Sequence, residues 1–204
     1  MLNHWRELLH QAVSPLDSGV RNLHVSGYRP SGNEPYRPGR TAAVLVPLLD
    51  LEVPEIVFTR RADNLPQHPG QVSFPGGAAE DNDTSAVQTA LREAYEEIGL
   101  PAEIVQPIGF LDRMDTISDY RVLPVVALVT PPVRWVPDER EVAEVFTVPL
   151  SVALDVERYE KRMFEQHGHQ YPIFTLKWKG HKIWGATAAI LMNLISRMHS
   201  KHEQ

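Results

Sequence analysis

The sequence has no cysteine among its 204 residues, which excludes disulfides and thiolate metal sites. It also has no long apolar run, because the longest, 42–49 and 122–129, are too short to span a bilayer and each contains a proline. Basic residues are not in excess: 26 acidic residues outnumber 20 lysines and arginines, giving a net charge of −6. Nucleic-acid-binding surfaces usually need a basic field. These absences predict a cytoplasmic protein that binds neither membranes nor nucleic acids.

The order of helix-like and strand-like segments predicts a mixed α/β (α+β) fold. Apolar residues recur at helical spacing near both ends of the chain, and strand-like apolar runs lie between them. We expect strands at 42–49, 55–60, 70–74, 105–114, 121–129, 144–150 and 172–178, and helices at 2–13, 85–98, 151–158 and 184–198. Strands interrupted by a helix and closed by another predict helices packed on a sheet.

The first 40 residues differ in composition from those that follow. Residues 27–40 are rich in proline, glycine and arginine, a composition typical of a loop or linker. We therefore expect an N-terminal helix and linker at 1–40, the main domain at 41–198 and a short tail at 199–204. No internal repeat or low-complexity tract divides the main domain further.

The helix at 85–98 has recognisable ends. Ser85 is followed three residues later by Gln88, the spacing of a capping box, so Ser85 is the expected N-cap. Gly99 is suited to the left-handed position that ends a helix. At 100° per residue, one stripe is expected to be buried and three carboxylates to lie on another side. The stripe comprises Val87, Leu91, Ala94 and Ile98, and the carboxylates are Glu93, Glu96 and Glu97.

Three carboxylates in the last turns of a helix reduce its stability. Glu93 and Glu97 are four residues apart, and like charges at that spacing cost about 0.2–0.5 kcal/mol. Carboxylates near a helix C-terminus also oppose the helix dipole. One interpretation is a solvated acidic face. The other is a divalent cation, because the spacing aims three carboxylates at one point and Mg²⁺ and Mn²⁺ prefer oxygen ligands.

The residues before this helix favour the cation. FPGG at 74–77 ends a strand in two glycines, which let the backbone approach a ligand closely, and REAYEEIGL follows at 92–100. Together these segments resemble the signature of the Nudix hydrolase superfamily, in which a glycine and an acidic residue precede Arg-Glu-apolar-x-Glu-Glu-x-Gly-apolar. The spacing from the glycine is one residue longer here, which leaves Glu80, Asp81 and Asp83 as candidates for the early acidic residue.

The resemblance implies the Nudix fold, a mixed curved β-sheet sandwiched between helices, and metal-dependent hydrolysis of a pyrophosphate bond. It implies that the carboxylates of the helix, with a backbone carbonyl of the glycine pair, bind Mg²⁺ or Mn²⁺. The expected ligands are Glu93, Glu96, Glu97 and Gly77. Arg92 is expected to pair with one of these carboxylates and to hold its rotamer.

The resemblance leaves the general base open, because some Nudix enzymes use a glutamate of the signature and others a glutamate from a later loop. Glu93 belongs to the first kind. Glu139, Glu141 and Glu144 belong to the second kind, and we favour Glu141 because it precedes the strand expected at 144–150. The expected catalytic residues are therefore Glu93, Arg92 and Glu141.

A second stretch indicates a substrate. VFTRRADNLPQHPGQVSFPGG at 57–77 resembles the motif of the coenzyme A diphosphohydrolase branch, with matches at Thr59, Arg61, Gly70 and the four residues 74–77. Pro66 stands where that branch has an arginine, which removes one phosphate contact. The resemblance implies hydrolysis of coenzyme A. The expected substrate-binding residues are Arg61, Gly76, Phe74 and Tyr120, with Arg61 as the candidate for the 3′-phosphate.

Two alternatives remain at the sequence level. Because of Pro66, another nucleoside diphosphate conjugate such as ADP-ribose or NADH is the second candidate substrate. A Nudix-fold binding module without catalysis is the third interpretation, but such modules typically lose the glutamates that this chain retains. The expected partner is in each case a small molecule, and the resemblance also allows a homodimer.

Overall fold

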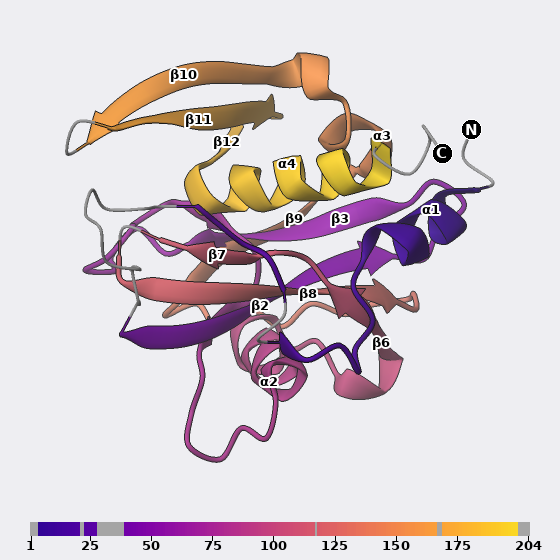
Figure 1. The fold of residues 1–204 in the computed structure, drawn as a ribbon. Coiled ribbons are helices and arrows are strands. Elements are labelled where there is room, and N and C mark those ends of the chain that lie inside the picture. The colour runs from indigo at the N-terminus through magenta and orange to yellow at the C-terminus, as the bar shows by residue number, and fades with distance from the viewer. Residues whose placement is uncertain (1–3, 21–22, 28–38, 117, 167–168, 200–204) are drawn as a thin grey trace.

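The computed structural model describes residues 4–20, 23–27, 39–116, 118–166 and 169–199 (Figure 1). The helices are α1 Trp5–Ala12, α2 Ala86–Ile98, α3 Leu150–Ala153 and α4 Gly185–His199, with 3₁₀ turns at Ala102–Ile104 and Val156–Arg158. The first strands are β1 Val25–Gly27, β2 Arg40–Leu49, β3 Glu55–Arg61, β4 Val72–Ser73, β5 Gly76–Ala78 and β6 Val105–Phe110. The others are β7 Arg113–Asp115, β8 Tyr120–Val129, β9 Val142–Pro149, β10 Tyr159–Gln166, β11 His169–Trp178 and β12 His181–Trp184.

The main sheet is mixed and has β2 near its centre. Its strand order is β1-β7-β8-β2-β3-β4, while β5 pairs with β2, β6 with β8 and β9 with β3. β2 runs parallel to β8 along its whole length and antiparallel to β3 only at its end, Leu48–Leu49. Because β2 and β3 pair only there, β2 has room to pair with β5 at residues 42–44. This arrangement holds the two glycines of β5 against the middle of the sheet.

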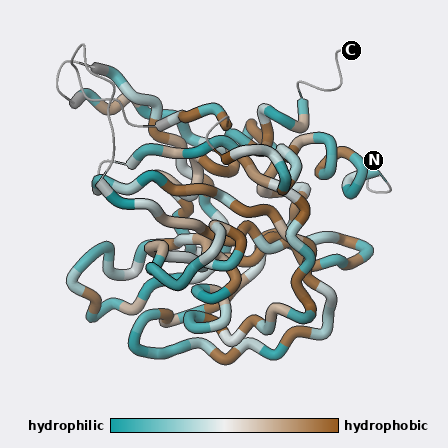
Figure 2. Tube along the Cα trace, turned by 60° about the horizontal axis from the view of Figure 1, so that its bottom comes forward, coloured by the Kyte–Doolittle hydropathy of each residue, from teal (hydrophilic) through white to brown (hydrophobic). Residues whose placement is uncertain are grey.

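Helices cover both faces of this sheet (Figure 1). Along β2, Leu45 packs into the core that includes Ala94 and Ile98 of α2, whereas its neighbour Val46 packs into the core that includes Leu191 of α4. Successive strand residues point to opposite faces, so a strand buried on both sides reads as a continuous apolar run. Hydrophobic stretches accordingly run through the interior, while the peripheral loops are mostly hydrophilic (Figure 2). The predicted mixed sheet between helices is confirmed.

The N-terminal segment packs onto the main domain. Trp5 and Leu9 of α1 are buried in the same core as α4, and β1 pairs in parallel with β7. Of the expected linker and tail, residues 28–38 and 200–204 lie outside the described part of the chain. No helix among the described residues is both long and apolar enough to cross a membrane.

Several elements differ from the expectation. The expected strand at 70–74 is the two-residue β4, the segment 105–114 forms β6 and β7, and the helix expected at 151–158 is the single turn α3 followed by a 3₁₀ turn. β10 and β12 were not predicted. They pair with β11 in a separate three-stranded antiparallel sheet that lies above α4 in Figure 1.

Candidate active site

The ends of α2 are formed by the predicted residues. The Ser85 hydroxyl accepts a hydrogen bond from the Gln88 amide at 3.2 Å. Gly99 has φ of 65° and its amide donates to the Tyr95 carbonyl at 2.9 Å. The predicted N-cap and C-cap are therefore confirmed, and they fix the register of the glutamates that lie between them.

The buried face of α2 is rotated from the predicted stripe. Ala94 and Ile98 are buried as expected, but Val87 and Leu91 are only half-buried. Glu97 is 6% exposed and lies on the buried face, whereas Glu96 is exposed. The expectation that the three glutamates share one side of the helix away from the core is therefore wrong. The reason is that α2 packs against β2 and β5, with Glu97 facing the glycines of β5.

Glu97 is a buried carboxylate that interacts with the backbone of β5. The Gly76 amide donates a hydrogen bond to its Oε2 at 3.2 Å. Burial raises the pKa of Glu97 to about 8, although the Gly76 hydrogen bond opposes this shift. The negative charges of Glu93 and Glu141 raise this pKa further, and the positive charge of Arg61 lowers it. These charged groups therefore surround one buried carboxylate.

Glu93 lies against the second glycine of β5. A Cβ atom added to Gly77 would lie 2.7 Å from the carboxylate carbon of Glu93, so any larger residue would displace this side chain. Burial raises the pKa of Glu93, while the hydrogen bond from Arg92 opposes the shift. The structure thus brings Gly76, Gly77, Glu93 and Glu97 together, as the sequence predicted.

Arg92 pairs with several acidic side chains. Its Nη1 lies 2.9 Å from Glu93 Oε1 and 3.0 Å from Glu96 Oε2. Its Nη2 lies 3.0 Å from Asp83 Oδ2 and also donates to the Ala78 carbonyl at 3.0 Å. The sequence predicted one carboxylate partner, whereas the structure shows three that hydrogen-bond to Arg92 and a fourth, Glu80, within ion-pair distance. Arg92 therefore links the glutamates of α2 to the loop that precedes the helix.

The structure distinguishes the three candidates for the early acidic residue. The Asp83 side chain is 4% exposed, and hydrogen bonding to Arg92 holds the pKa of its carboxyl below the usual value. The Glu80 side chain is 63% exposed and lies 3.7 Å from Arg92, and Asp81 is exposed. Asp83 is therefore the residue that anchors Arg92.

Replacing Asp83 with Asn tests this role. The variant keeps an acceptor oxygen but loses the charge, so Arg92 will hold Glu93 less firmly. We expect kcat/KM to fall by about 10–100-fold, the range for residues that orient metal ligands. Asp81→Asn makes the same change at an exposed position and serves as the control. Equal activity of the two variants in a steady-state assay would remove Asp83 from this role.

The loop at 130–141 brings Glu141 to the same site. The amides of Val136 and Asp138 donate to the carbonyls of Ile98 and Glu97 at 3.0 and 2.9 Å, so the loop satisfies the end of α2. The Ala62 amide then donates to the Glu141 carbonyl at 2.8 Å. The Glu141 carboxylate is exposed, and its charge raises the pKa of both Glu93 and Glu97.

Glu144, another candidate general base, interacts with different groups. Its carboxylate lies 3.8 Å from Arg60 Nε and 3.5 Å from His181 Nε2. Glu139 is exposed in the loop before β9. This placement supports the choice of Glu141 over Glu144, because Glu141 is the one whose charge acts on the glutamates of α2.

Arg61 lies on the α2 side of β3. Val57 packs in the core on the α2 side and Phe58 in the core on the α4 side, so strand alternation places Arg61 with Val57 and Arg60 with Phe58. The Nε of Arg61 is buried and has no hydrogen-bond partner among the described residues. Its positive charge lowers the pKa of Glu97, which agrees with a position on the same side of the sheet as the carboxylates.

Two expected substrate contacts lie elsewhere. Phe74 is 3% exposed and stacks on Phe58 in the core, with ring centroids 4.9 Å apart. Phe74 therefore packs in the core next to the glycines of β5, and the expected contact with the substrate is wrong. The Tyr120 hydroxyl accepts a hydrogen bond from Arg40 at 3.0 Å. The strand registers place Tyr120 two strands across and three residues along from Gly77, roughly 14 Å away.

The donor set fits a hard divalent cation. Glu97 is a buried carboxylate without an ion-pair partner in the described part of the chain, and it stands beside a second carboxylate with a raised pKa. A cation would relieve both the burial cost and the mutual repulsion. Among the described residues, no three acidic or histidine side chains already have metal-site geometry, and Arg92 binds Glu93 and Glu96. Arg92 contacts Oε1 of Glu93 and Oε2 of Glu96, so the other oxygen of each carboxylate is the one that can bind a cation while Arg92 holds the side chain in place.

Comparisons with known proteins agree with this geometry. Residues 39–169 match the NUDIX domain. The chain is 40% identical over 162 residues to an uncharacterized Nudix hydrolase, NudL, of Enterobacter sp. (strain 638), covering 79% of this chain and 84% of the relative. It is 41% identical over 165 residues to the NudL of Pectobacterium atrosepticum, covering 81% and 86%.

The fold is also similar to solved structures. A MutT protein from Methanosarcina mazei Go1 aligns with 85% of this chain and 100% of its own, with a TM-score of 0.51 and 16% sequence identity. At that identity the likeness concerns the fold alone, which agrees with the mixed sheet and its covering helices. With its NUDIX domain and its close Nudix hydrolase relatives, the chain belongs to the Nudix family and is a hydrolase acting on pyrophosphate bonds.

Proposed function

We propose that the protein uses a divalent cation, Mg²⁺ or Mn²⁺, to hydrolyse the diphosphate of coenzyme A and its derivatives. The products are 3′,5′-ADP and 4′-phosphopantetheine. The observation that carries the proposal is the position of Arg61, a residue of the motif at 57–77, whose charge acts on the buried carboxylate of Glu97. This position joins the segment that resembles the coenzyme A branch to the glutamates of the Nudix signature.

The roles of the residues follow from their positions. Glu93, Glu96 and Glu97, with the Gly77 carbonyl, would hold the cation, which neutralises diphosphate charge and activates water when bound. Arg61 would bind a diphosphate oxygen beside them, because a guanidinium is suited to phosphate recognition. Glu141 is the proposed general base, since it is an exposed carboxylate next to Glu93 and Glu97. Arg92 positions Glu93 and does not itself contact the substrate.

The alternatives concern the substrate and the presence of catalysis. ADP-ribose and NADH contain the same type of diphosphate, and Pro66 leaves one position of the coenzyme A motif unmatched. A binding module without catalysis is disfavoured, because such modules typically lose the glutamates of the signature, and this chain retains all three.

A substrate panel tests the proposal. Coenzyme A, ADP-ribose, NADH and deoxynucleoside triphosphates are each incubated with the enzyme and Mg²⁺ or Mn²⁺, and the products are separated by ion-exchange chromatography. We expect the highest kcat/KM for coenzyme A, with 3′,5′-ADP as a product. A higher value for ADP-ribose or NADH would replace the proposed substrate. Absence of turnover from a folded protein would favour the binding module.

Replacing Arg61 with Ala tests its position. The sequence suggested that Arg61 reads the 3′-phosphate, but its location beside Glu97 predicts contact with the diphosphate. We therefore expect kcat/KM to fall by about 100-fold for coenzyme A and for dephospho-coenzyme A alike, because both carry the diphosphate. A fall in kcat/KM for coenzyme A but not for dephospho-coenzyme A would instead indicate that Arg61 binds the 3′-phosphate.

A further inference from the structure

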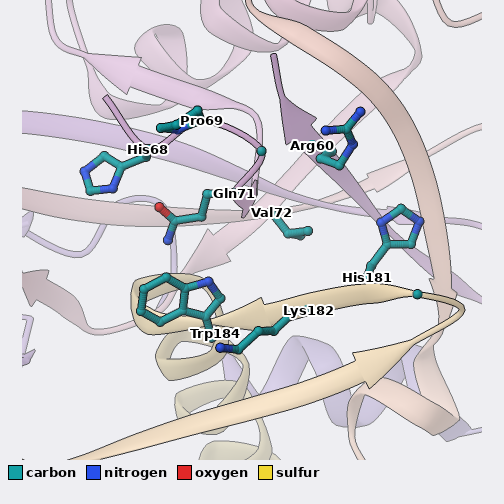
Figure 3. Close-up of a pocket in the computed structure, with 10 residues that line it drawn as sticks. Arg60, His68, Pro69, Gln71, Val72, His181, Lys182 and Trp184 are labelled. Carbon is teal, nitrogen blue, oxygen red and sulfur yellow. The ribbon is translucent and has the colours of Figure 1, made fainter. Parts of the chain in front are cut away.

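A pocket of about 350 Å³ lies on the α4 side of the main sheet, where β3 ends. Its lining comes from β3, from the segment 68–72 and from the β11–β12 turn and β12. Figure 3 shows the segment that carries His68 and Gln71 facing the strand that carries His181, Lys182 and Trp184. None of these residues belongs to the carboxylate site on the α2 side.

The pocket carries an excess of positive and imidazole groups. Arg60, His68, His181 and Lys182 line it, and no acidic side chain of the described residues does. The half-exposed Glu144 carboxylate lies behind two of these groups, 3.8 Å from Arg60 Nε and 3.5 Å from His181 Nε2. Arg60 pairs at 2.8 Å with Asp63, whose side chain is 76% exposed. Among the described residues no carboxylate lies within ion-pair distance of Lys182, since the nearby Glu160 pairs with Lys177 at 2.6 Å. An anion entering the pocket therefore meets a lysine that has no ion pair among the described residues, although the Glu160 charge also acts on it.

The pocket also offers an aromatic surface. The Trp184 side chain lines it and is 38% exposed, which is unusual for such a large apolar side chain. The Lys182 ammonium lies 5.1 Å from the centroid of its ring. Aromatic side chains stack on nucleobases, and lysine binds phosphate as a point charge. A phosphate and a planar ring are therefore the chemical groups that this pocket suits.

The segment that forms the opposite wall is held in an uncommon conformation. His68 has φ of 54° and Gly70 has φ of 65°, so two left-handed residues occur within three positions. Such conformations cost free energy in residues other than glycine and cluster at ligand sites. A Cβ atom on Gly70 would lie 3.0 Å from Asp63 Oδ1, so the loop folds closely around the Arg60–Asp63 pair. This packing fixes the guanidinium of Arg60 at the pocket.

We propose that this pocket is a second subsite that binds the 3′-phosphate and adenine of the coenzyme A nucleotide. The identity of the nucleotide rests on the proposed function. Arg60 and Lys182 bind the phosphomonoester, and Trp184 contacts the base. A volume of about 350 Å³ is near the lower limit of ligand pockets, enough for the nucleotide end of the substrate.

The two sites lie on opposite faces of the main sheet and share neighbouring residues of the chain. Arg60 in the pocket and Arg61 beside Glu97 are consecutive residues on opposite sides of β3. Val72 in the pocket and Gly77 at the carboxylates are five residues apart, so their Cα atoms are separated by at most about 18 Å. The proposal requires the substrate to pass around the end of β3, with its diphosphate at Arg61 and its 3′-phosphate at Arg60.

Lys182→Ala and Arg60→Gln test the subsite. Lys179→Ala is the matched control, because Lys179 also lies over a tryptophan, Trp178, at 5.3 Å but does not line the pocket. Binding of 3′,5′-ADP and 5′-AMP is measured by calorimetry in EDTA, without catalysis. We expect Lys182→Ala and Arg60→Gln each to weaken the binding of 3′,5′-ADP by about tenfold more than the binding of 5′-AMP. The control should bind both nucleotides as the wild type does.

Steady-state kinetics complete the test. We expect Lys182→Ala to lower the ratio of kcat/KM for coenzyme A to that for dephospho-coenzyme A by about tenfold, and Lys182→Arg to restore it. An unchanged ratio, or equal weakening of both nucleotides, would overturn the subsite. If wild type does not hydrolyse coenzyme A but binds 3′,5′-ADP through Lys182, the subsite stands and the proposed substrate fails. Undetectable binding of 3′,5′-ADP to wild type would overturn the subsite.

Discussion

Replacing Glu97 with Gln should stabilise the metal-free protein while removing nearly all of its activity. Burial raises the pKa of Glu97 to about 8, whereas the unfolded carboxyl has a pKa near 4.5. At pH 7 the folded state therefore holds a proton that the unfolded state has released. The contribution of protonated Glu97 to the stability of the wild type is fully present below pH 4.5. It decreases above that pH and is lost as the pH rises through 8.

Glutamine cannot ionise, so the variant does not lose this stability. It also keeps the side-chain oxygen that accepts from the Gly76 amide. We expect the variant to be more stable by on the order of 3 kcal/mol at pH 7, with no difference at pH 4.5. Its kcat/KM should fall by about a thousandfold, because the buried metal ligand has lost its charge.

Urea unfolding in EDTA between pH 4.5 and 8.5 measures the stability difference. Glu96→Gln is the matched control, because Glu96 is an exposed glutamate of the same helix and should follow the wild-type pH dependence. Parallel stability curves for wild type and Glu97→Gln would show that Glu97 is not buried as described.

Replacing the two glycines of β5 with Ala, one at a time, should have different effects: Gly76→Ala should lower stability, and Gly77→Ala should weaken metal binding. A Cβ atom on Gly76 would lie 2.4 Å from the Ala43 carbonyl oxygen and 2.5 Å from the Val44 Cα, and φ at this position is 153°. Backbone of β2 cannot move aside without breaking its pairing. We expect Gly76→Ala to lower the free energy of unfolding by about 3 kcal/mol or more.

Gly77→Ala provides the contrast. Its Cβ would meet the end of the Glu93 side chain at 2.7 Å, and that side chain can rotate away. We expect a change of less than about 1 kcal/mol in stability but a loss of about 10–100-fold in Mn²⁺ affinity, because a proposed ligand is displaced. Thermal unfolding and Mn²⁺ titration followed by electron paramagnetic resonance measure the two effects. A stable Gly76→Ala variant, or unaltered Mn²⁺ binding by Gly77→Ala, would contradict this account.

Local features of the fold were predictable from the sequence. Ser85 and Gly99 mark the ends of α2 because capping depends on a few neighbouring residues. The strand β2 was predictable because a strand buried on both faces has a continuous apolar run. The burial of Glu97 was not predictable from helical spacing alone. It depends on the packing of α2 against β2 and β5, which rotates the buried face toward residues 90, 94, 97 and 98.

The second sheet and its pocket had no clear sequence signal. β10 has the sequence YEKRMFEQ, in which residues 161–165 are all exposed, so it lacks the alternation of a half-buried strand. The pocket forms from residues near 60, 70 and 182, which only the tertiary structure brings together. Phe74 shows a different limit, since a motif match does not reveal whether a side chain contacts substrate or core. Asp83 was one of three candidates until its contact with Arg92 distinguished it.

The most direct test of the account is the position of bound Mn²⁺. Crystals grown without metal and then soaked in MnCl₂ give an anomalous map at the manganese absorption edge. The account predicts an anomalous peak within about 2.5 Å of carboxylate oxygens of both Glu93 and Glu97. A fully soaked crystal without a peak at these side chains would contradict it.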